Sequence, residues 1–175
     1  TVYRENVGNA LSGLGHIEDS VGNVEQALAH FRESEDVFEA LVREEPANTA
    51  FQWYRVWKKS YSAELLSDLD RLDLAWQQFS ETRRMAERLL NEQGEASIEN
   101  RILFGRFLVH FAELAHRRGQ VAEAEALMDE GMAVLAQEAE FLMLDEPDVP
   151  PAQFDRWLGL WERYLQEYVA ANAKG

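Results

Sequence analysis

Apolar residues recur along most of the chain at the three- and four-residue spacing that is typical of amphipathic helices. Glycine, proline and asparagine interrupt this pattern at residues 22–23, 45–49, 94, 119 and 147–151, and Asp70-Arg71 makes a further break. The spacing therefore predicts seven helices, over residues 3–20, 24–44, 50–69, 72–92, 97–118, 121–144 and 152–171. Asn48 or Thr49 is expected to cap the third helix, and Ser97 is expected to cap the fifth.

One short pattern returns three times, reading VGNVEQALAHF at 21–31, LDRLDLAWQQF at 69–79 and RRGQVAEAEALM at 117–128. Its small residue falls at intervals of 48 and 49 positions, and a bulky residue follows four positions later. These positions are Ala27, Ala75 and Ala124, followed by Phe31, Phe79 and Met128. A constant interval of this size predicts stacked helical units, in which each alanine allows two helices to approach closely.

The arrangement resembles tetratricopeptide repeats, in which a glycine closes the first helix and a small residue plus an aromatic one pack the second. Leu14-Gly15, Gly22-Asn23, Ala27 and Phe31 match that pattern in the first unit. The resemblance covers residues 5 to 145, and Phe51-Gln52 after the turn at 45–48 is similar to a long-helix variety common in large bacterial proteins.

The resemblance implies an all-α fold, a right-handed α–α superhelix of three helical hairpins with a C-terminal capping helix. The expected units are residues 3–46, 47–95 and 96–147, within a single domain spanning 1–175. The cap is the segment 152–171, whose apolar stripe is well suited to cover the last hairpin. That stripe consists of Phe154, Trp157, Leu158, Trp161, Leu165 and Tyr168.

Charge and composition narrow the choice of partners. The chain has 32 acidic and 17 basic residues, a formal net charge of −15. Such a field opposes binding to nucleic acid and to anionic membranes, although it also serves solubility. The absence of cysteine, of a leader and of an apolar run of about 20 residues indicates a cytoplasmic protein. A start at Thr1 indicates a processed chain or a piece of a longer protein.

The sequence offers little for catalysis, so no catalytic residue, metal site or cofactor is expected. His110 and His116 are six residues apart, which places them on different faces of a helix, and a pairing of His16 with His110 across repeats is the remaining option. The glycines near the N-terminus match no phosphate-binding fingerprint. Scattered carboxylates in helices always form apparent acid–base pairs. The chain is therefore predicted not to be an enzyme.

In the architecture implied by the resemblance, the first helix of each hairpin lines a concave groove. The phase set by Gly15, Ala63 and Ala112 predicts which residues point there. They are Asn9, Ser12, His16, Trp57, Tyr61, Glu64, Asp68, Arg106, His110, Glu113 and Arg117. Aromatic and arginine side chains are common anchors of recognition surfaces. Two arrangements stay open for Trp57 and Tyr61, either exposure in the groove or packing between repeats.

The predicted function is a protein-interaction scaffold that binds a partner peptide or helix in the groove. Related domains that grip acidic chaperone tails use Lys, Arg and Asn, whereas Glu64 and Asp68 occupy the centre here. The partner is therefore expected to be hydrophobic or basic. Two alternatives remain: a regulatory or sensor arm of a larger enzyme or transcription regulator, and a self-association module that forms a homodimer through the C-terminal helix.

Overall fold

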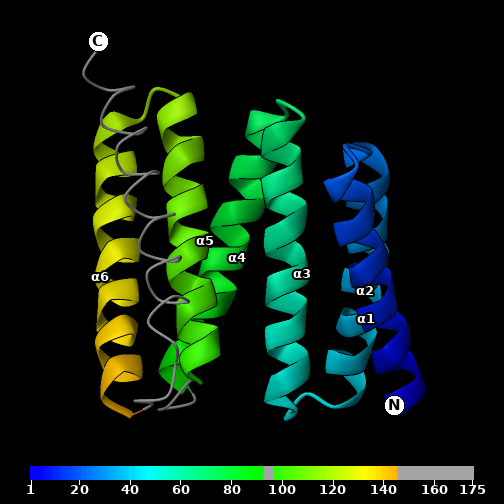
Figure 1. Cartoon of the computed structure of the whole chain (residues 1–175). Coiled ribbons are helices and arrows are strands. Elements are labelled where there is room, and N and C mark those ends of the chain that lie inside the picture. Colours follow the sequence, from blue (N-terminus) through cyan, green and yellow to red (C-terminus); the bar gives the residue numbers. More distant parts are fainter. Residues whose placement is uncertain (93–96, 146–175) are drawn as a thin grey trace. The chain divides into compact units, whose positions relative to one another are not determined.

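The computed structural model describes residues 1–92 and 97–145, with side chains described through residue 137. This part of the chain is helical (Figure 1), and each helix predicted within it is present with ends that agree to within one residue. The helices are α1 (Val2–Ser20), α2 (Val24–Glu44), α3 (Thr49–Asp68), α4 (Leu72–Glu92), α5 (Ile98–Arg117) and α6 (Val121–Asp145). The predicted helix 152–171, with its apolar stripe, and the break at Gly94 lie outside the described residues.

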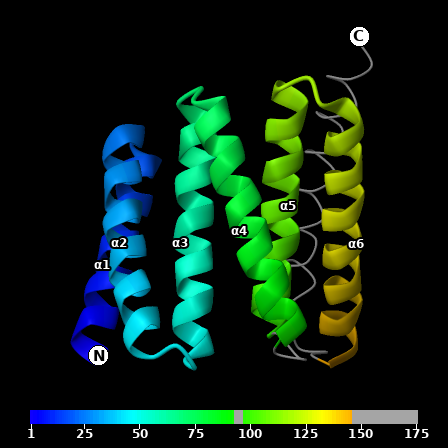
Figure 2. The same cartoon turned by 180° about the vertical axis from the view of Figure 1, so that it is seen from behind.

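Helices that follow one another in the chain pack against one another. The chain divides into two compact units, Thr1–Glu138 and Ala139–Gly175, and all side chains discussed below belong to the first. Within it α1 packs on α2, α2 on α3, α3 on α4 and α4 on α5, while α3 also contacts α5 (Figure 2). This order of contacts is consistent with a helical repeat. None of the described helices combines the length and apolar character that a bilayer crossing requires.

Two of the helix starts follow the predicted capping chemistry. The Asn48 side chain accepts a hydrogen bond from the Phe51 backbone N–H at 3.4 Å, so Asn48 rather than Thr49 is the cap of α3. The Ser97 hydroxyl accepts one from the Asn100 N–H at 3.2 Å at the start of α5. Each bond satisfies a backbone donor that has no partner inside its own helix.

Three turns with the same geometry mark the repeat. Gly22, Asp70 and Gly119 have φ angles of 83°, 57° and 76°, and they lie 48 and 49 residues apart. At each turn the next residue donates its N–H to the carbonyl five positions earlier, at 2.8 to 2.9 Å. Asp70 thus takes the place of glycine in the second unit, in a left-handed conformation that aspartate tolerates better than most residues. The predicted breaks at these positions are confirmed.

The repeated small and bulky positions are buried. Ala27, Ala75 and Ala124 are fully inaccessible, and the bulky residues four positions later are at most 4% exposed. Aromatic rings then join one helical pair to the next. Phe79 of α4 lies 5.3 Å from the ring of Phe107 and 5.2 Å from that of Phe111, both on α5. The core therefore runs through successive helices at the predicted phase.

Large and small residues exchange places across equivalent helix contacts. A Cβ at Gly8 would lie 2.7 Å from the Phe38 ring, and one at Gly105 would lie 2.6 Å from the Leu135 side chain. The same register places Val56 and Ala86 at these positions in the second unit, where both are fully buried. The bulky residue thus comes from the second helix in the first and third units and from the first helix in the second.

Candidate interaction face

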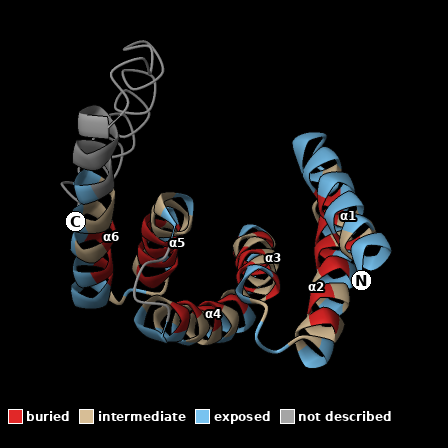
Figure 3. Cartoon of the chain, turned by 90° about the horizontal axis from the view of Figure 1, so that it is seen from below, coloured by how far each residue is buried: buried red, intermediate tan, exposed pale blue. Residues whose placement is uncertain are grey.

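The predicted groove residues lie on α1, α3 and α5. In Figure 3, α3 and α5 lie on one side of the packed helices and α4 on the other. Asn9, His16, Asp68, Arg106, Glu113 and Arg117 are exposed; Tyr61, Glu64 and His110 are half-buried; Ser12 and Trp57 are buried. The set therefore contains both accessible and packed members.

Charged side chains from these three helices act on one another, although they are far apart in the chain. Asp19 of α1 raises the pKa of both Glu64 and Asp68 on α3. Glu113 of α5 also raises the pKa of Asp68. We call this group the charged face; it consists of Asp19, Glu64, Asp68, Arg106, His110, Glu113 and Arg117.

Glu64 lies at the centre of the charged face, with a side chain that is 26% exposed. Burial is the main cause that raises the pKa of its carboxyl, and the negative charges of Asp68 and Asp19 act in the same direction. His110, whose Nε2 is 4.0 Å from Glu64 Oε2, and Arg106 lower it. The positive groups do not outweigh burial and repulsion, so the ionised carboxylate is held at an unfavourable position.

Asp68 is in a similar state. Partial burial raises its pKa first, and the charges of Asp19 and Glu113 raise it further, against the opposing effect of Arg117 and His110. The guanidinium of Arg117 is engaged elsewhere. It donates to the Ser67 carbonyl at 2.8 Å, to the Ser67 hydroxyl at 2.6 Å and to the Asp70 carboxylate at 3.1 Å. The charged face is consequently acidic at its centre.

The two predicted aromatic anchors pack between helices, which is the second of the arrangements that the sequence left open. Trp57 is 7% exposed, and its ring stacks on Trp53 at 5.1 Å. Its Nε1–H donates to Asn100 Oδ1 at 3.0 Å, which ties α3 to α5. The Tyr61 ring lies 4.7 Å from His16 and 5.2 Å from Phe31, so it joins α3 to α1 and α2. Both residues contribute to the stability of the helix contacts.

Sequence reasoning missed Lys58, which lies beside this face. Its ammonium is 6.0 Å from the ring centroids of both Phe38 and Tyr54, and burial lowers its pKa. Burial and then the charge of Lys58 lower the pKa of His16. The available signal was the helical spacing, because Lys58 lies four residues after Tyr54 and three before Tyr61.

The histidines do not form the cross-repeat pair that was considered. His16 packs edge-on against Tyr61 and Phe31, at 4.7 and 4.9 Å, whereas His110 lies near Glu64. Within residues 1–92 and 97–137, no three His, Cys, Asp or Glu side chains are grouped so that they could hold a metal ion.

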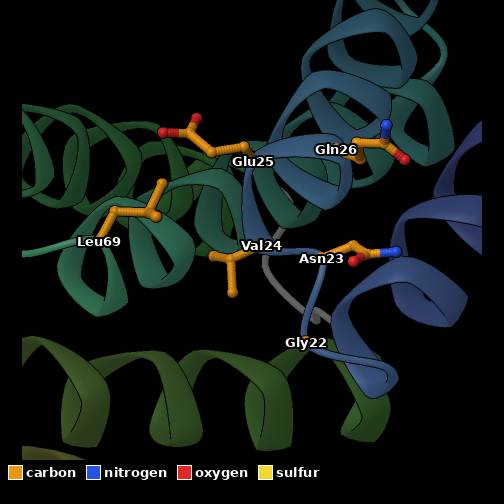
Figure 4. A pocket seen from close by; sticks show the side chains of 6 residues that line it. All are labelled: Gly22, Asn23, Val24, Glu25, Gln26 and Leu69. Carbon is orange, nitrogen blue, oxygen red and sulfur yellow. The ribbon is translucent and has the colours of Figure 1, made fainter.

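A separate depression of about 380 Å³ lies at the turn between α1 and α2 (Figure 4). It is lined by Gly22, Asn23, Val24, Glu25, Gln26 and Leu69, none of which belongs to the charged face. Its carboxylate, Glu25, is paired with Arg71 at 2.5 Å. The depression therefore lies between the α1–α2 turn and the end of α3, and its lining brings no reactive groups together.

Comparison with known proteins does not assign the chain to a family, since no protein-family model matches it and no curated protein is similar to it in sequence.

Proposed function

We propose that this chain is a helical-repeat protein of the tetratricopeptide kind that acts as a non-catalytic interaction scaffold. Its partner is a protein segment, an extended peptide or an amphipathic helix, that binds on the charged face. One observation carries the proposal: Asp19, Glu64, Asp68 and Glu113 come from three different helices and act on one another at one place.

The chemistry of the charged face favours a basic partner. A raised pKa means that the ionised form of Glu64 or Asp68 is less favourable than in water. A lysine or arginine side chain placed beside them would reduce this cost, whereas an acidic segment would increase it. The net charge of −15 would also steer a basic segment toward the protein.

A pair of synthetic peptides tests the proposal directly. A lysine–leucine amphipathic helix serves as the basic probe, and a glutamate–leucine helix of the same length serves as the acidic one. Binding is measured by calorimetry with wild type, Asp68→Lys and Glu33→Lys. Glu33 is an exposed residue of α2, so both substitutions change the net charge equally.

We expect the basic probe to bind wild type and Glu33→Lys with similar affinity, and Asp68→Lys to weaken binding by about tenfold or more. Because an approaching cation lowers the pKa of Glu64 and Asp68, binding should also release protons within their titration range. Equal weakening by the two substitutions would show attraction by the bulk charge alone and would contradict a site on this face.

A further inference from the structure

The first helix has an apolar face that the packing of the first unit does not use. Six residues of α1 follow intervals of four, three, four, three and four, the heptad spacing of a helix that packs along another helix. We call them the α1 seam; they are Tyr3, Val7, Ala10, Leu14, Ile17 and Val21, the last directly following the helix.

The α1 seam points away from α2. The side of α1 that packs against α2 is formed by Gly8, Ser12 and Gly15. Five of the six seam residues are exposed, with Tyr3 at 79%, Leu14 at 45%, Ile17 at 60% and Val21 at 65%, whereas Val7 is half-buried. Figure 3 shows most of α1 in the colour of exposed residues. A continuous row of large apolar side chains in water is a usual mark of a contact surface.

Three of the six equivalent positions one repeat later are buried, at Phe51, Ser62 and Leu65, and the other three, at Arg55, Lys58 and Leu69, are half-buried. A shift of 48 residues takes Tyr3 to Phe51 and Ile17 to Leu65, each 4% exposed. Phe51 belongs to the core cluster that joins α3 to α2 through Phe38 and Leu41. The second unit therefore uses this face for helix packing, whereas in α1 most of the same face is exposed.

We propose that the α1 seam binds the α1 seam of a second copy of this chain, in an antiparallel pair about a two-fold axis. In this register Val7 packs against the partner's Ile17, and Ala10 packs against the partner's Leu14. Tyr3 meets the partner's Val21 at each end. Each bulky residue then faces a smaller or branched one, which favours interlocking.

The flanking residues support the antiparallel direction. On one side of the seam, Arg4, which also forms an ion pair with Glu44 of its own chain, lies opposite the partner's Glu18 at both ends of the pair. On the other side, Gly13 lies opposite the partner's Gly13 at the centre. Among the described residues, no heavy atom lies within 4 Å of a Cβ built at Gly13, so this side permits close approach.

The large negative charge of the chain is only partly balanced at this contact. Each seam with its flanks carries one positive residue, Arg4, which is paired with Glu44 of its own chain, and one negative residue, Glu18. In a parallel pair, Arg4 and Glu18 would each lie opposite an uncharged residue, whereas in the antiparallel pair they lie opposite each other. A helix of 19 residues is about 28 Å long, which is short for an interface, so we expect a dimer with a dissociation constant on the order of micromolar.

Sedimentation equilibrium of the full chain tests the dimer. Wild type is expected to associate reversibly, and Ile17→Glu is expected to raise the dissociation constant at least about 100-fold, because it buries a carboxylate in the seam. Leu74→Glu is the matched control, since Leu74 is 54% exposed on α4 and outside the seam. A monomeric wild type, or equal effects of the two variants, would overturn the proposal.

A charge exchange tests the pairing itself. Val7→Lys alone should weaken the dimer, but Val7→Lys combined with Ile17→Glu should restore most of it, because each lysine then meets the partner's glutamate. A double variant as weak as either single one would refute this register. Circular dichroism confirms that the variants are folded, as both sites lie off the α2 contact.

Single cysteines test the direction, since the chain contains none of its own. Gly13→Cys should form a disulfide-linked dimer under mild oxidation, because the two residues meet at the axis. Ser20→Cys alone should not form a disulfide-linked dimer, but a mixture of Ser20→Cys and Asn6→Cys chains should form one. Linkage of Ser20→Cys with itself would refute the antiparallel pair.

Trp161→Glu separates the proposal from association through the predicted segment 152–171. If Trp161→Glu dissociates the dimer while Ile17→Glu does not, the α1 seam is not the interface. Asp68→Lys should leave the dimer intact, so failure of peptide binding and failure of dimerisation are distinguishable.

Discussion

Two glycine substitutions on α1 separate the effect of helix propensity from the effect of packing. Alanine at Gly15 would place its Cβ 2.9 Å from the Phe31 ring, closer than side-chain carbons approach one another. The ring cannot easily withdraw, because Phe31 is 1% exposed and lies between His16 and Tyr61, at 4.9 and 5.2 Å. Alanine at Gly13 is the matched control, since no atom of the described residues lies within 4 Å of its Cβ.

Both substitutions gain the same helix propensity, but only Gly15→Ala also overpacks a core contact. Alanine in place of glycine within a helix stabilises it by about 0.5–1 kcal/mol. Overpacking a tight core contact costs about 1–3 kcal/mol. We therefore expect Gly13→Ala to raise the free energy of unfolding by about 0.5–1 kcal/mol. Gly15→Ala should lower it by up to about 2 kcal/mol, so the variants differ by about 1–3 kcal/mol.

Urea unfolding followed by circular dichroism at low protein concentration measures both values, and dilution keeps association through α1 from contributing. The slope of the transition should be the same in both variants, because neither changes the surface exposed on unfolding. If Gly15→Ala stabilises the protein as much as Gly13→Ala does, the Phe31 ring is not packed against α1 in this way, and the α1–α2 contact described above is wrong.

Three further predictions concern the turns, the repeat register and the charged face. Gly22→Ala should lower the free energy of unfolding by about 1–2 kcal/mol, since φ is 83° with no described atom near its Cβ; an unchanged urea midpoint would contradict the left-handed turn. Ala124→Leu should cost about 1–3 kcal/mol in thermal unfolding, because the site is fully buried; no loss would count against the register. Burial raises the folded-state pKa of Glu64 above its unfolded value, so the folded state binds more protons between the two and the wild type loses stability as pH rises through that window. Glu64→Gln removes this loss. Urea unfolding at a series of pH values should show that the free energy of unfolding of Glu64→Gln rises relative to that of the wild type within this pH window, and that the relative gain persists at neutral pH. Parallel dependences on pH in the two proteins would contradict the direction of the pKa shift.

The amino-acid sequence by itself determined the helices, their ends and their buried phase. A helix depends on residues three and four positions apart, and a turn depends on one or two residues, so both are local properties. The break at Asp70-Arg71 illustrates this, because it was predicted from its place in the repeat and has the same hydrogen bonds as the glycine turns. The expectation that α1, α3 and α5 share a face came from the resemblance to tetratricopeptide repeats, and the same phase selected the residues on it.

Only the tertiary structure decided which members of that face are accessible. Trp57 and Asp68 both follow the predicted phase, but Trp57 packs against α5 and donates to Asn100, whereas Asp68 is exposed. The exchange of large and small residues between Gly8–Phe38 and Val56–Ala86 was also hidden, because each pair joins two helices. Such contacts depend on how far apart the helices lie and how their side chains interlock. Periodicity along one helix contains no information on that distance.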